Sequence, residues 1–144
     1  MARNSGKGSE HIFESVLRSF GKRAYFCRLV DAAEVYGRVG KTGNLRPQPS
    51  DYIIVIDGQT SFAEVKSTHD NNAFRFSLLR TKQSAAAEQI VKAGGSYFIF
   101  LHRVPTNEWY CIPYERIMEV KSAGKASISW SDLREDTWKI SSSI

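Results

Sequence analysis

The fold is decided by the stretch Asp51-Tyr-Ile-Ile-Val-Ile-Asp-Gly-Gln-Thr-Ser-Phe-Ala-Glu-Val-Lys66. Its first part, Asp51–Ile56, is rich in β-branched residues and is typical of a buried strand. The pair Asp57-Gly58 that follows is a signal for a tight turn between two strands. The chain then returns over Thr60–Ser67 as a second strand, so the sequence predicts a β-hairpin.

The hairpin is expected to gather three charged side chains. Residues two apart on a strand point to one face, so Glu64 and Lys66 lie side by side, while Ala63 and Val65 face apolar packing. The tight turn brings Asp51 beside them. Two carboxylates held together repel without a counter-ion, and oxygen ligands, including the Val65 carbonyl, suit Mg²⁺ or Mn²⁺. The pattern therefore predicts a divalent metal site, with Lys66 beside the attacking water.

The same pattern has an ordinary interpretation, because an acid-x-Lys alternation is common on solvent-facing strands. Two helices offer support for the metal site. Glu10 lies at the edge of the buried helical face formed by apolar residues 12, 13, 16, 17 and 20, whereas Glu14 is expected further round, toward solvent. Gln83 is early in a second helix and can hydrogen-bond a water or phosphate. Each residue also has an ordinary interpretation. Glu10 can be a first-turn acid that interacts favourably with the helix dipole, and Gln83 can be an ordinary surface residue.

The remaining pattern predicts one α/β domain over residues 1–144, with a mixed sheet flanked by helices. Residues 31–49, rich in Gly, Pro and basic side chains, are expected to form a basic loop or short projecting hairpin. The other predicted elements are a helix from Ser9 to Phe20, a strand over Arg23–Leu29, a helix over Arg80–Ala93, a strand over Ser96–His102, its hairpin partner Trp109–Pro113, a helix over Tyr114–Ser122 and a short strand near Ser127–Trp130.

Composition narrows the class of protein. The chain is 42% hydrophobic and 24% charged, as in an ordinary soluble domain. Its apolar runs are too short to cross a bilayer, and the polar N-terminus has no signal-peptide core. Cys27 and Cys111 lack the spacing of a zinc site. We expect both to be reduced core residues of a cytoplasmic protein, in a nucleoid or a phage-infected cell.

Basic residues flank the predicted site. The net charge is +5 and the pI is about 9.3, a balance that permits nucleic-acid binding. The alternative is an ordinary solvated surface, on which most lysines and arginines lie. The side chains expected to contact DNA phosphates are Lys7, Arg38, Lys41, Arg75, Arg80 and Lys82.

The spacing Asp51-(12 residues)-Glu64-Val65-Lys66 resembles the PD-(D/E)XK nuclease superfamily. Ser50 stands where the motif name has Pro, and Pro49 is one place earlier. Within this superfamily the chain most resembles Holliday junction resolvases of the RecU type, and archaeal resolvases also begin with Gly-x-x-x-Glu on a helix. The segments that carry the resemblance, which spans about residues 4–112, are Asn4–Glu10, Phe62–Thr68, Phe74–Leu79 and Lys82-Gln83.

The resemblance implies a restriction-endonuclease-like fold and a Mg²⁺-dependent, homodimeric endonuclease that nicks four-way DNA junctions symmetrically. It implies that Glu10, Asp51 and Glu64 bind metal, that Lys66 acts at the attacking water, and that Gln83 supports them.

Two departures leave alternatives open. Resolvases of this type often carry a long stalk, whereas the corresponding stretch Asp31–Pro49 is short here. The C-terminal part, with Trp130 and Trp138, has no counterpart in the resemblance. A restriction, nicking or repair endonuclease, a non-catalytic DNA-binding relative and an unrelated α/β binding domain therefore remain as alternatives.

Overall fold

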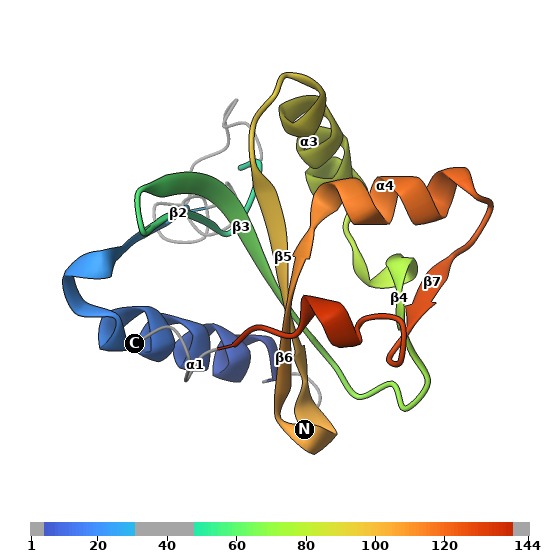
Figure 1. Cartoon of the computed structure of the whole chain (residues 1–144), viewed down its shortest axis with the longest axis horizontal. Coiled ribbons are helices and arrows are strands. Elements are labelled where there is room, and N and C mark those ends of the chain that lie inside the picture. Colours follow the sequence, from blue (N-terminus) through green and yellow to red (C-terminus); the bar gives the residue numbers. More distant parts are fainter. Residues whose placement is uncertain (1–4, 31–47, 140–144) are drawn as a thin grey trace, which may run out of the picture.

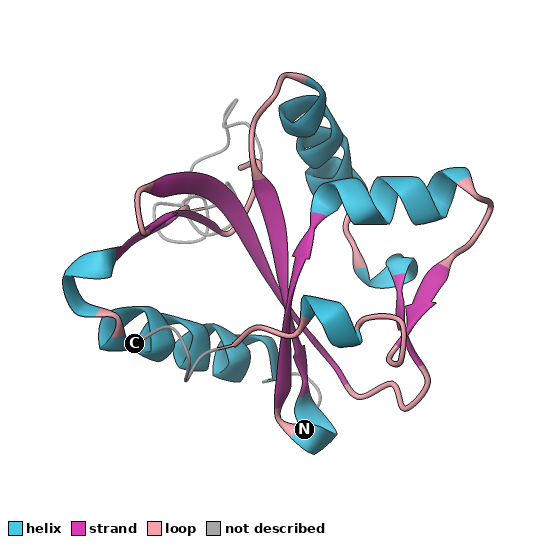
Figure 2. Ribbon diagram, in the orientation of Figure 1, coloured by secondary structure: helices cyan, strands magenta, loops and turns pink. Residues whose placement is uncertain are grey.

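The computed structural model describes residues 5–30 and 48–139. A five-stranded sheet has the order β1-β2-β3-β5-β6, with β3 and β5 parallel and the other neighbours antiparallel (Figure 2). Its strands are β1 (Ala24–Arg28), β2 (Tyr52–Ile56), β3 (Gln59–Thr68), β5 (Tyr97–Arg103) and β6 (Glu108–Pro113). The helices are α1 (Ser5–Ser19), α3 (Thr81–Lys92) and α4 (Tyr114–Ser122).

Helices cover both faces of the sheet (Figure 1). On one face, Phe13 and Leu17 of α1 pack against Tyr52, Ala63 and Phe100. On the other face, α3 and α4 pack on the opposite side chains of the same strands, so the sheet separates two apolar cores. This three-layer α/β arrangement confirms the predicted fold class.

The predicted hairpin is present, with β2 paired to β3 from Tyr52↔Ala63 to Ile56↔Gln59. Asp57 and Gly58 both have positive φ, 49° and 87°, as a two-residue turn between antiparallel strands requires. The Arg23 side chain donates to both Asp57 carboxylate oxygens at 2.9 and 2.8 Å. These hydrogen bonds lower the pKa of Asp57.

Strand β2 begins at Tyr52, paired with Ala63, but β3 continues to Thr68. Beyond Ala63, β3 therefore has its partner β5 on one side and no β2 residue within the paired register on the other. We call this open side of β3, over Glu64–Thr68, the notch. Asp51 directly precedes the first residue of β2, so it lies at the end of the notch where Glu64 is. The notch therefore contains the residues of the predicted site.

The structure corrects two details of the first helix and first strand. Helix α1 begins at Ser5, four residues before the predicted start, which places Glu10 in its second turn rather than its first. The helix-dipole explanation for Glu10 is therefore wrong. Cys27 is exposed rather than buried, because β1 is an edge strand and the face that carries Cys27 and Tyr25, itself 64% exposed, is not covered by α1.

The short strand predicted near Ser127–Trp130 is present as β7 (Ser127–Ser129). It pairs with β4 (Ala73–Arg75) in a second small sheet, and the sequence pattern predicts no strand at β4. Cys111 is half-buried, and burial raises its pKa to about 12.

Most of the predicted basic loop, including Arg38 and Lys41, lies outside the described residues. Over the described ranges, no helix is long and apolar enough to cross a membrane. The short 3-10 helices are Gly21–Arg23, Phe76–Leu78, Val104–Thr106 and Arg134–Asp136.

Phe13 should be a principal anchor of α1 on the sheet. It is fully buried, with its ring centroid 4.8 Å from Phe100 and 5.1 Å from Tyr52. Phe13→Ala should lower the free energy of unfolding by about 3–5 kcal/mol, because it leaves a cavity. Ile12→Ala, a neighbour that is 38% exposed, should cost less than about 1 kcal/mol. Urea titration measures both, and equal losses would contradict the assigned face of α1.

Candidate active site

The notch brings three predicted residues together on the α3 face of the sheet. The Lys66 ammonium lies 3.2 Å from Glu64 Oε2. The backbone N–H of Val65, which faces the open side of β3, donates to Asp51 Oδ2 at 2.9 Å. The Asp51 side chain thus supplies the acceptor that a longer β2 would have supplied, and it lies in place beside Glu64.

Glu64 is a buried carboxylate, only 1% exposed. Its Oε1 accepts a hydrogen bond from the Tyr97 hydroxyl at 3.0 Å. Its Oε2 has no satisfactory hydrogen bond within the described part of the chain, although Lys66 is close enough for an ion pair. Burial raises the pKa of Glu64, the charge of Lys66 lowers it in part, and the negative charge of Asp51 raises it further.

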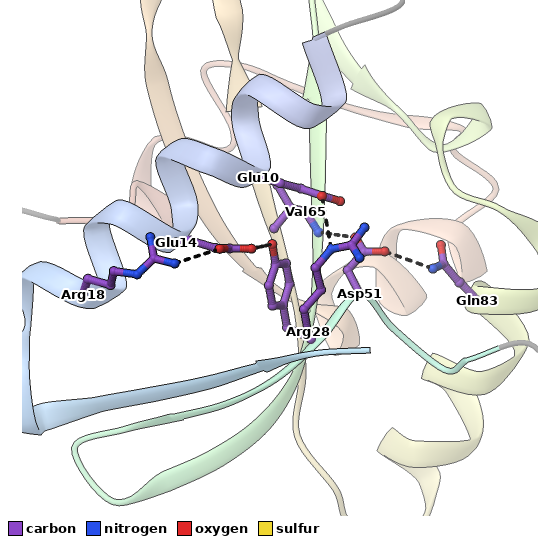
Figure 3. A network of polar contacts seen from close by, with 8 residues as sticks. Glu10, Glu14, Arg18, Arg28, Asp51, Val65 and Gln83 are labelled. Carbon is purple, nitrogen blue, oxygen red and sulfur yellow. Dashed lines mark hydrogen bonds and ion pairs between the residues drawn. The ribbon is translucent and has the colours of Figure 1, made fainter. Parts of the chain in front are cut away.

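Gln83 approaches the same carboxylates from the first turn of α3. Its Nε2 donates to Asp51 Oδ1 at 3.4 Å, a long hydrogen bond (Figure 3). Its Oε1 is buried and has no hydrogen-bond partner among residues 5–30 and 48–139. Glu64 Oε2 and Gln83 Oε1, two buried oxygens of residues near Asp51, therefore have no hydrogen-bond donor among the described residues.

Glu10 reaches the region from α1, on the opposite face of the sheet. It pairs with Arg28, whose Nε lies 3.6 Å from Glu10 Oε1 (Figure 3). Burial raises the pKa of Glu10, and the charge of Asp51 raises it further, so the two carboxylates are electrostatically coupled. However, no three His, Cys, Asp or Glu side chains among the described residues are close enough to form a metal cluster. Arg28 provides the positive charge beside Glu10 in this structure.

Glu14 was expected to face solvent, and this prediction is wrong. Its Oε2 accepts a hydrogen bond from the Tyr52 hydroxyl at 2.6 Å, and its Oε1 accepts one from Arg18 at 3.2 Å. Burial, together with the hydrogen bond to Glu14, raises the pKa of Tyr52. The spacing of Glu14 four residues after Glu10 indicates a shared helical face, and this signal could have identified it.

A polar link, Ser9–His102–Asn107, in which Ser9 and His102 are buried, holds the start of α1 against the sheet. Ser9 Oγ lies 2.7 Å from His102 Nδ1, and His102 Nε2 lies 2.8 Å from Asn107 Oδ1. The imidazole stacks on the indole of Trp109, with 4.5 Å between the ring centroids. Since Ser9 directly precedes Glu10, the link fixes the backbone from which the Glu10 side chain extends.

The described residues predicted to contact DNA are exposed: Lys7, Arg75, Arg80 and Lys82. Arg80 and Lys82 flank the first residue of α3, at the end of the helix that carries Gln83. Arg75 donates to Asp70 at 2.7 Å. The pKa of Asp70 is lowered to about 2, chiefly by the backbone N–H of Asn72 and then by Arg75.

Glu64 should make the stability of the metal-free protein depend on pH. Because its pKa is raised on folding, the native state binds more protons than the unfolded state as the pH rises above 4.5, and stability falls. The free energy of unfolding of Glu64→Gln relative to wild type should therefore rise from pH 4 to pH 8. Denaturant titrations in EDTA measure this difference.

Asp57→Asn is the control of opposite sign. Arg23 lowers the pKa of Asp57, so the wild type should gain stability over this variant as the pH rises through 3.8. The same slope in both variants, or a pH-independent difference for Glu64→Gln, would contradict the assignment of the buried charge.

A sequence family and a solved structure are similar to this chain. The sequence model of the family "Recombination protein U" (RecU) matches residues 31–144, well over half of the chain. This match begins after the Asn4–Glu10 segment of the resemblance and includes Trp130 and Trp138, for which the resemblance found no counterpart. No curated protein sequence matches.

Among solved structures, the chain is similar to Hjc of Archaeoglobus fulgidus, a Holliday junction resolvase from an archaeal hyperthermophile. The TM-score is 0.61 at 15% identity, over 96% of this chain and 98% of that chain. This likeness shows the fold, and the family match adds the activity. The chain therefore belongs to the RecU family of Holliday junction resolvases and is an endodeoxyribonuclease of the PD-(D/E)XK fold.

Proposed function

We propose that this protein hydrolyses phosphodiester bonds in four-way DNA junctions, with a divalent metal ion held at the notch. The observation that carries the proposal is the state of Glu64. A carboxylate is buried with one oxygen lacking a hydrogen bond, beside a lysine and near a second carboxylate. Such an arrangement is unfavourable for stability alone and favourable for binding a cation.

The residues at the notch fit a hard cation. The carboxylates of Asp51 and Glu64 and the amide oxygen of Gln83 are oxygen donors. The Val65 carbonyl is a fourth, because the N–H and C=O of one strand residue point to the same side, and the Val65 N–H faces the notch. Glu10 would join them by exchanging its Arg28 partner for the metal. This donor set favours Mg²⁺, with Mn²⁺ as a substitute.

The bound cation would lower the pKa of a water ligand and neutralise charge on the scissile phosphate. Lys66 has a separate role. Its side chain is 15% exposed and its ammonium is held by Glu64, so it can donate to the attacking water or to the phosphate oxygens as charge develops. Gln83, next to Asp51, would orient a water or phosphate through its amide group.

Substrate contacts would come from basic residues around the notch. Arg80 and Lys82 lie at the N-terminal end of α3, where the helix dipole also favours a phosphate. Lys7 and Arg75 would extend this surface, and Arg38 and Lys41 would add contacts from the stretch outside the described residues. Four-way junctions, rather than linear DNA, are inferred from the family and from the name of the Hjc relative. A homodimer would place two sites for symmetric nicks.

Cleavage of a synthetic four-way junction tests the proposal. With Mg²⁺ the wild type should nick opposite strands, and Lys66→Ala should lower the single-turnover rate at least about 100-fold. Junction binding in Ca²⁺ should be retained by the variant. If junction, flapped, linear and single-stranded DNA all stay uncut, the proposal is wrong. Equal cleavage of a linear duplex of the same sequence would instead indicate a restriction or repair enzyme.

The salt dependence of junction binding tests the role of α3. Removing one basic side chain that neutralises a phosphate should reduce the slope of log K against log salt by about 1. Arg80→Ala combined with Lys82→Ala should therefore reduce it by about 2. The control is Lys92→Ala, an exposed lysine in the last turn of the same helix, about 16 Å away by helical rise. Lys92→Ala should leave the slope unchanged. If it also reduces the slope by about 1, phosphate binding is not localised at the start of α3.

A further inference from the structure

Tyr97 is buried directly behind the candidate metal site. The side chain is 1% exposed, and its hydroxyl is within hydrogen-bonding distance of two acceptors from different segments. One is the carbonyl of Pro49, at 2.8 Å, and the other is Glu64 Oε1, at 3.0 Å. Tyr97 is on β5, the neighbour of β3. Its ring lies across the face of β3, and its hydroxyl contacts the segment that leads into Asp51.

The segment around Asp51 is attached to the sheet at several points. The Asp51 carbonyl accepts from the backbone N–H of Leu29 at 2.8 Å, which ties the segment to β1. The Ser50 hydroxyl donates to the Tyr52 carbonyl at 2.7 Å, which fixes the local turn. Tyr97 adds an attachment to β5, and this attachment shares its hydroxyl with Glu64. The Tyr97 hydroxyl is thus a buried contact that the segment before Asp51 and the Glu64 carboxylate share.

The Tyr97 ring is held firmly enough to act as a reference point. It stacks on Phe62, with ring centroids 6.4 Å apart and planes at 17°. It also packs against the Tyr114 ring in a T-shaped arrangement, with 5.6 Å between the ring centroids. With the ring fixed, the hydroxyl holds Glu64 Oε1 inward, so Oε2 turns toward Lys66 and the notch.

We propose that Tyr97 is a positioning residue that sets the relation between the Asp51 and Glu64 carboxylates and so preorganises the cation site. This inference rests on the proposed metal-dependent function. The hydroxyl has one hydrogen and two acceptors, and it keeps the Pro49–Asp51 segment and the Glu64 carboxylate in contact with the same point. Without the hydroxyl, the Pro49 carbonyl and Glu64 Oε1 lose this shared contact, and the cation must itself order the Glu64 carboxylate relative to Asp51.

Tyr97→Phe isolates the hydroxyl, because phenylalanine keeps the ring and its stacking. Calorimetric titration of the DNA-free protein with Mn²⁺ should show a dissociation constant about ten- to one-hundredfold above wild type, the range typical of residues that support metal ligands. The Mg²⁺ concentration for half-maximal junction cleavage should rise with it. Junction binding in Ca²⁺-free, EDTA-containing buffer should not change, since the hydroxyl is buried away from the DNA surface.

Tyr114→Phe is the matched control. Tyr114 is fully buried and touches the Tyr97 ring, but its hydroxyl has no hydrogen-bond partner in the described part of the chain. This variant should bind Mn²⁺ as the wild type does. The stoichiometry of each titration reports the folded fraction, which separates a loss of affinity from a loss of folded protein.

The possible results distinguish this inference from the function on which it rests. Suppose Asp51→Asn and Glu64→Gln abolish Mn²⁺ binding but Tyr97→Phe binds as the wild type does. Then the positioning role is wrong and the metal site stands. An equal loss in both tyrosine variants would also overturn the role, since ring packing would explain it. If the wild type binds no Mn²⁺, or binds it independently of Asp51 and Glu64, the metal site and the positioning role both fall.

Discussion

The open side of β3 is the constraint on which the rest of the structure depends. Backbone N–H and C=O groups need partners when they are buried, and β3 runs past the point where β2 begins. The Asp51 carboxylate meets the Val65 N–H there, so a side chain takes the place of a strand. The same gap lets Glu10 approach Asp51 from α1 on the opposite face, and it leaves room for Gln83 from α3.

The buried Glu64 shows how this arrangement trades stability for chemistry. The strand alternation buries Ala63 and Val65 against α1 and points Glu64 to the opposite face of the sheet, which α3 and α4 cover. The desolvation of the Glu64 charge there is unfavourable. Lys66 and Tyr97 compensate only in part, because Glu64 Oε2 still lacks a hydrogen bond. A cation at the notch would offset the remaining desolvation penalty of the Glu64 carboxylate. The metal-free site would therefore be less stable than the metal-bound site.

Features with a local signal could be predicted from the sequence, and features made by tertiary contacts could not. The Asp57-Gly58 turn and the alternation around Glu64 are local, and both are confirmed. Cys27 was misassigned because alternation does not reveal which strand lies at a sheet edge. Tyr97 in an apolar strand is typical of core packing, and nothing nearby indicates that its hydroxyl meets Pro49 across β3. The Arg28 partner of Glu10 and the His102 partner of Ser9 likewise come from distant segments.

The polar link from Ser9 through His102 to Asn107 has a consequence for the timescale of motion at the site. A shift of α1 would break the buried hydrogen bond between Ser9 and His102, and the His102 ring cannot follow the helix because it is held by Asn107 and stacked on Trp109. The helix backbone at Glu10 is therefore held in place, and the carboxylate can change partner only by rotating its own side chain. Rotamer changes of exposed side chains take picoseconds to nanoseconds, whereas helix displacements take microseconds or longer. Exchange of Glu10 between Arg28 and the notch would then not require the slower displacement of the helix.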